Sequence, residues 1–130
     1  MKGILKMEKI KLFENAIKNN LFTCSSQDPA AINFGLASAY METVKTKNQQ
    51  LNFSGPIFEH DVAELADQMD DAGIHTFTIS CTSSGLLNVL ALFEQHYWFV
   101  QGMTEVLANY NNFETGNPEV IPALIVHKKY

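Results

Sequence analysis

The stretch from Thr76 to Trp98, TFTISCTSSGLLNVLALFEQHYW, changes its hydrophobic period from that of a strand to that of a helix. Residues 74–80 are rich in β-branched and aromatic side chains and predict a strand. Residues 83–98 then show helical spacing, through Leu86, Val89, Leu90 and Phe93. A strand that leads directly into a helix constrains the chain to a fold that packs helices on a sheet.

Two further strands are predicted after this helix, over residues 99–110 and 119–127. The segment between them, NNFETGNP, contains turn-forming dipeptides and predicts a hairpin with a longish loop. Pro122 lies inside the last strand. Because proline cannot donate to the hydrogen-bond ladder, it indicates an edge strand or a bulge.

Three helices are predicted before these strands. The first covers residues 5–20, where apolar side chains recur at helical spacing and lysines occupy the other face. The second begins with Asp28 as N-cap and Pro29 at the first helical position. The third covers residues 57–73, with Gly73 as its C-cap. Phe58, Val62, Leu65 and Met69 form its predicted buried face.

The predicted order is therefore three N-terminal helices followed by β-α-β-β, an α/β (α+β) protein. Its sheet is small and mixed, with three to four strands packed by helices. The segment QLNFS, residues 50–54, is the candidate for a fourth, short edge strand. A length of 130 residues suits one domain that spans residues 1–130.

The distribution of charge is uneven. The chain has no arginine, and residues 48–127 contain no lysine but ten acidic side chains. The net charge of the whole chain is −5. Such a surface repels nucleic acid and attracts basic proteins, so we expect a basic protein partner and no direct nucleic-acid binding.

Six of these carboxylates lie around the polar side of the third predicted helix. One interpretation is a solvated helix face; the other is a docking surface for a positively charged protein, up to mimicry of a phosphate backbone. Their helical spacing does not supply a calcium loop. The predicted partner-binding residues are Glu59, Asp61, Glu64, Asp67, Asp70 and Asp71.

The SCTSSG turn lies where a strand becomes a helix, a position that favours anions because free backbone N–H groups point into the loop. No lysine or arginine follows it at the spacing of a phosphate-binding motif. We expect Thr82 or Ser83 to cap the helix. The alternative is a ligand site, with Cys81 as a thiol at a helix N-terminus. The candidate ligand-binding residues are Ser80, Cys81, Thr82, Ser83 and Ser84.

No metal site, cofactor or membrane span is predicted. His60, His75, His96 and His127 are too far apart in sequence for a local metal motif. Cys24 and Cys81 form no CxxC pair and suit a reducing compartment. No apolar run reaches bilayer length, and lysines and glutamates interrupt the N-terminal segment where a signal peptide would be apolar. We expect a cytoplasmic protein.

The segments FTIS, SSGLLNVLALFEQHYW, GMTEV and PALIV carry a resemblance. The C-terminal 55 or so residues resemble a group of small uncharacterised proteins of phages and mobile elements in low-GC Gram-positive bacteria. The resemblance covers less than half of the chain and implies a mobile-element setting, with no catalytic residues carried over.

The function expected from these features is non-enzymatic protein binding. In the setting that the resemblance implies, the role is inhibition of a basic, nucleic-acid-binding host factor, as anti-CRISPR and anti-restriction proteins do. The alternative is a small enzyme or ligand-binding domain that uses the turn at residues 80–85. A homodimer joined through the aromatic hairpin is compatible with either function.

Overall fold

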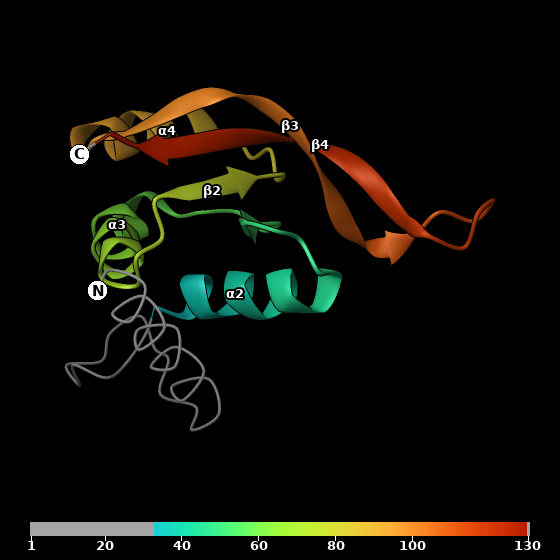
Figure 1. Cartoon of the computed structure of the whole chain (residues 1–130). Coiled ribbons are helices and arrows are strands. Elements are labelled where there is room, and N and C mark those ends of the chain that lie inside the picture. The colour runs from blue at the N-terminus through green and yellow to red at the C-terminus, as the bar shows by residue number, and fades with distance from the viewer. Residues whose placement is uncertain (1–32, 130) are drawn as a thin grey trace.

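The computed structural model of the chain describes residues 33–129 (Figure 1). Helices and one four-stranded mixed sheet make these residues an α+β structure, with strand order β1-β2-β4-β3. β1 pairs with β2 in parallel, and β4 pairs with both β2 and β3 in antiparallel orientation. The elements are α2 (Phe34–Thr46), β1 (Leu51–Phe53), the 3₁₀ helix η1 (Glu59–Asp61), α3 (Val62–Asp71), β2 (Thr76–Ile79), α4 (Leu86–Gln95), β3 (Trp98–Asn111) and β4 (Pro118–Lys128).

The prediction of three helices before the sheet is wrong for the described residues, because α2 alone precedes β1 there and α3 follows β1. The predicted helix at residues 5–20 and the predicted cap at Asp28 and Pro29 lie outside the described residues. α2 itself has Asn33 as its N-cap, with a non-helical backbone. The short edge strand predicted within residues 50–54 is confirmed as β1.

The core is built around Phe77 in the middle of β2, whose side chain is fully buried. Its ring contacts Phe53 from β1, Phe93 from α4 and Trp98 from β3, with ring centroids 5.2–5.3 Å apart. Tilted and edge-on aromatic contacts of this kind add stability beyond the area that they bury. This cluster therefore joins three strands and one helix at a single point.

α3 packs on this core through the apolar helix face that the sequence predicted. Val62, Leu65 and Met69 are buried, as their spacing requires. Phe58 was predicted on the same face, but it precedes the helix and is 57% exposed. Gly73 follows the C-terminus with a φ of 76°, where a side chain would be strained. The backbone N–H of Gly73 donates to Asp70 and that of Ile74 to Met69, the pattern of a Schellman motif.

The hairpin of β3 and β4 extends beyond the rest of the sheet as a two-stranded arm (Figure 1). β2 ends at Ile79, opposite Leu124, whereas β4 begins at Pro118 and pairs with β3 alone up to that point. Pro122 lies in this part of β4. The prediction that its strand is an edge is wrong for β4 as a whole, which lies between β2 and β3.

The proline is tolerated because its missing N–H has no strand to meet. Pro122 lies opposite Glu105, two residues from the Leu107–Val120 pair. The backbone N–H of Leu107 donates to Oδ1 of Asn48, and its C=O accepts from Nδ2 of Asn48. Both groups therefore point away from β4. Because hydrogen-bonded and non-hydrogen-bonded pairs alternate in antiparallel strands, the pair at Pro122 also needs no bond between β3 and β4.

The open edge of β1 is covered by α2. The backbone N–H of Asn52 points out of the sheet and donates to Oγ1 of Thr43, at 2.9 Å. That hydroxyl in turn donates to the carbonyl of Ala39 in the same helix, at 2.7 Å. A helix laid on a strand edge prevents it from pairing with another chain.

Candidate functional site

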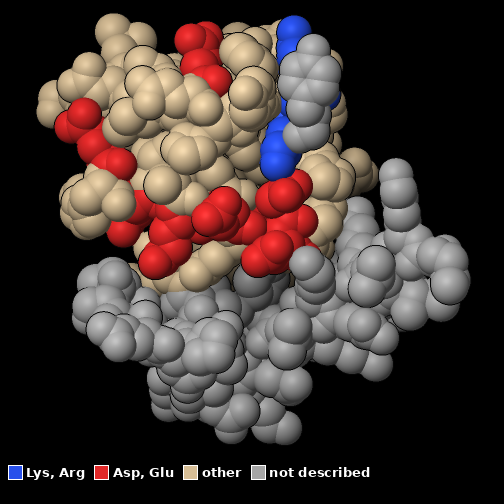
Figure 2. All heavy atoms as spheres, turned by 90° about the vertical axis from the view of Figure 1, so that its left-hand side faces the viewer, with Lys and Arg blue, Asp and Glu red and all other residues tan. Residues whose placement is uncertain are grey.

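The six carboxylates predicted as a partner-binding surface fall into two groups. Asp61 and Glu64 are half-buried, whereas the other four are exposed on η1 and α3. Figure 2 shows the carboxylates gathered as a band on one side of the molecule, with lysine atoms beside one end of it. We call the four exposed residues the acidic face: Glu59, Asp67, Asp70 and Asp71.

Asp61 and Glu64 serve the structure instead. The side-chain N–H₂ of Asn33 donates to Oε1 of Glu64 at 2.7 Å and to Oδ1 of Asp61 at 3.2 Å. The Oδ1 of Asn33 accepts from the backbone N–H groups of Gly35 and Leu36 and so caps α2. One buried asparagine thereby fastens the start of α2 to α3, and it occupies two of the six predicted carboxylates.

Asp70 has a partner of its own at the end of the sheet. Its carboxylate lies 2.8 Å from Nζ of Lys128, the last residue of β4, and 3.9 Å from Nδ1 of His75. The lysine side chain is 15% exposed, so the pair is partly shielded from solvent. Asp70 therefore contributes less free negative charge to the acidic face than its exposure suggests.

A stacked pair of aromatic rings lies next to the acidic face. The rings of Phe58 and His60 are 5.8 Å apart and nearly parallel. Both flank the exposed Glu59, and Phe58 also lines an apolar groove of about 440 Å³ between the start of α2 and the loop before η1. Exposed aromatic side chains beside charged ones are typical of protein-binding surfaces.

The SCTSSG turn does not form the predicted cap. The N-cap of α4 is Gly85, and no side chain caps the helix, so the expectation for Thr82 and Ser83 is wrong. Thr82, Ser83 and Ser84 are exposed, and Cys81 is half-buried. The first turn is closed by the backbone, with the N–H of Leu86 donating to the carbonyl of Ser83.

Ser80 separates from the rest of the turn. Its backbone N–H extends the pairing of β2 by donating to Phe53, and its hydroxyl accepts from the side chain of Asn52 at 3.1 Å. Cys81, Thr82, Ser83 and Ser84 line neither the apolar groove beside Phe58 nor the polar pocket between α2 and the hairpin arm. Of the five candidate ligand-binding residues, Ser80 alone lines one of these two pockets.

Ser80 instead lines a polar pocket that no pattern in the sequence predicted. This pocket has a volume of about 240 Å³ and lies between the C-terminal half of α2, the end of β1 and the hairpin arm. Glu42 is among its lining residues, and Oε1 of Glu42 is buried with no hydrogen-bond partner within the described part of the chain. No local motif marks Glu42, because the pocket is assembled from segments far apart in sequence.

Within residues 33–129, no three or more His, Cys, Asp and Glu side chains are grouped so that they could hold a metal ion. In the same residues, no helix combines the length and apolar character needed to cross a bilayer.

These elements define a small α+β protein with an acidic helix face and a polar pocket beneath a hairpin arm. A family model described as a domain of unknown function (DUF7698) matches residues 35–127, from the first turn of α2 to the end of β4. The match covers well over half of the chain, which therefore belongs to this family. Comparison with curated proteins and with solved structures gave no match.

Proposed function

We propose that this chain is a non-enzymatic, cytoplasmic protein that binds a basic protein partner through its acidic face. The observation that carries the proposal is the exposure of four carboxylates on one side of η1 and α3 (Figure 2). Residues 33–129 contain eleven acidic side chains and four lysines. A field of this sign and strength speeds association with positively charged proteins and opposes contact with nucleic acid.

The neighbouring apolar surface supports a protein partner over a merely solvated face. Phe58 is 57% exposed and Phe34 is 58% exposed, and both line the groove beside the acidic face. Charge alone gives a fast but weak encounter, whereas burial of aromatic anchors supplies most of the affinity in protein interfaces. The two features together are what a docking surface requires.

The resemblance to phage and mobile-element proteins suggests the class of partner. A nucleic-acid-binding host factor presents a basic groove, and an acidic protein of this size can occupy it. We therefore propose inhibition of such a factor, of the anti-CRISPR or anti-restriction type. The alternative is a ligand site at residues 80–85, of which Ser80 alone lines the polar pocket.

The proposal is tested by capture from a lysate of a low-GC Gram-positive bacterium, with proteins identified by mass spectrometry. The full chain should retain a nucleic-acid-binding protein that added duplex DNA displaces, and retention should fall steeply with salt. The variant E59K/D67K/D71K should lose this protein, whereas E94K/E114K, with exposed residues elsewhere, should keep it. Equal capture by both variants would show that the acidic face does not bind the partner.

A further inference from the structure

The polar pocket under the hairpin arm carries one formal charge. Among the residues that line it, Glu42 is the one acidic residue, and none is basic. Its Oε1 is buried with no hydrogen-bond partner in the described residues, and none of the ion pairs found there involves Glu42. A buried carboxylate oxygen without a partner is costly. The pocket therefore has one acidic side chain in its lining, and none of the ion pairs within residues 33–129 involves it.

The walls of the pocket are held in place by hydrogen bonds that do not involve the carboxylate of Glu42. On one side, the side chain of Asn48 donates to Oγ1 of Thr46 and forms two hydrogen bonds with the backbone of Leu107. On the other, Asn52 donates to Ser80. These polar groups are already paired with one another, so they fix the shape of the cavity and do not neutralise the carboxylate.

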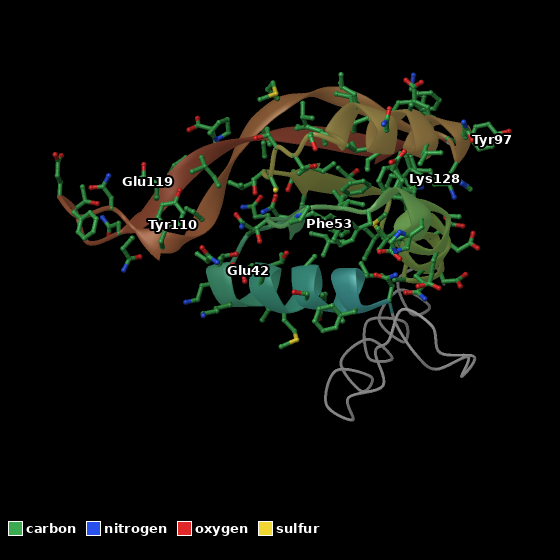
Figure 3. The ribbon with its side chains drawn as sticks, turned by 180° about the vertical axis from the view of Figure 1, so that it is seen from behind. Glu42, Phe53, Tyr97, Tyr110, Glu119 and Lys128 are labelled. Carbon is green, nitrogen blue, oxygen red and sulfur yellow. The ribbon has the colours of Figure 1, made fainter. Side chains whose placement is uncertain are left out.

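The rim adds a second element that favours cations. Tyr110 comes from the hairpin arm, lines the pocket and is 57% exposed. Figure 3 shows Glu42 on α2 below the arm and Tyr110 at the arm above it. The face of an aromatic ring attracts a positive charge through its quadrupole. A carboxylate at the base and a ring at the rim suit a cation that enters by its charged end.

We propose that this pocket binds an alkylammonium or guanidinium group on an aliphatic stem. A volume of about 240 Å³ is several times the roughly 30 Å³ of one water molecule, and so has room for such a group. A divalent metal ion is disfavoured because it requires several oxygen ligands, and one carboxylate is all the charge that the lining offers. The site is separate from the acidic face, so its test is independent of the proposed function.

The test uses the full-length, ¹⁵N-labelled chain titrated with n-butylammonium and with ethylguanidinium chloride. Saturable shifts are expected at the amides of Thr46, Asn48 and Tyr110, with roughly millimolar affinity for ligands of this size. Butan-1-ol and butyrate, which share the stem but are neutral or anionic, should give none. Equal shifts with these two compounds, or no saturable shift with either cation, would overturn the proposal.

Three variants separate recognition from folding. E42Q should weaken binding of butylammonium roughly ten-fold or more, because a charge-assisted hydrogen bond is lost. E94Q removes an exposed carboxylate outside the pocket and should change nothing. N109D adds a carboxylate to the lining and should tighten binding several-fold. If E42Q binds as the parent does, or if N109D weakens binding, Glu42 is not the recognition group.

The source of the cation is distinguished by two further probes. N-acetyl-lysine methylamide represents a side chain on a protein, and butane-1,4-diamine represents a free amine. If the capped lysine binds as well as butylammonium, the pocket receives a side chain from a partner. If the diamine binds and the capped lysine does not, the pocket receives a small amine. Both results support the cation site, and failure of both probes contradicts it.

Discussion

The side-chain amide of Asn48 forms two hydrogen bonds with the backbone of Leu107, donating at 3.0 Å and accepting at 2.9 Å. The two residues are 59 positions apart in sequence, and Leu107 belongs to the outer strand of the hairpin arm. The amide thus takes the place of a neighbouring strand where the arm meets the loop between α2 and β1. The polar pocket exists because this contact holds the arm over the helix.

Replacement of Asn48 by alanine should therefore loosen the arm without disturbing the core. Two backbone groups of Leu107 lose their partners, which should lower the free energy of unfolding by about 1–2 kcal/mol. Hydrogen exchange should accelerate at Leu107 and stay unchanged at Phe77, which is in the core. Asn109→Ala, an exposed change on the same arm, serves as the control. Identical exchange in the two variants would show that Asn48 does not hold the arm.

Asn33 should be the most sensitive polar residue of the described chain. Asn33→Ala removes the cap of α2 and the donor shared by Asp61 and Glu64, and should cost about 2 kcal/mol in urea unfolding. Asn33→Asp keeps the capping oxygen but places a third carboxylate beside those two. The stability that the Asn33→Asp variant loses should be partly recovered in high salt, because screening weakens the repulsion among the three carboxylates. The alanine variant should show no such recovery.

Glu42 should reveal a conflict between stability and ligand binding. Glu42→Leu removes the buried carboxylate oxygen that lacks a partner and should raise the free energy of unfolding by about 1 kcal/mol, or Tm by about 5 °C. The emission of Trp98, the single tryptophan and fully buried, follows the transition. Added butylammonium should raise Tm of the parent protein but not of the variant. A variant less stable than the parent would mean that Glu42 stabilises the fold.

The local patterns in the sequence predicted most of the fold. Strand β2, helix α4 and the hairpin were predicted from their periodicity, and Gly73 marked the end of α3. The errors came from long-range contacts. Pro122 predicts an edge strand, but it lies at a non-hydrogen-bonded pair with β3, as the contact of Leu107 with Asn48 shows. On its other side β2 has already ended, so no strand needs the missing N–H. The start of α2 depends on Asn33, which gains its carboxylate partners through the tertiary fold.

The candidate site was predictable only in part for the same reason. Charge along the chain indicated an acidic helix face, and four of its six residues are exposed. Sequence could not show that Asp61 and Glu64 are bound to Asn33, 28 and 31 residues away. Glu42 carried no signal at all, because its pocket forms only when the arm, β1 and α2 meet. Patterns identify surfaces on one element, whereas pockets between elements require the fold.

Binding of a basic partner by the acidic face is best tested by the dissociation constant of the captured protein, measured at two salt concentrations. For the parent chain and for E94K/E114K, the affinity should fall together as salt rises. For E59K/D67K/D71K, the affinity at low salt should be at least roughly ten-fold weaker and should depend much less on salt. If all three proteins share one affinity and one salt dependence, the acidic face does not bind the partner.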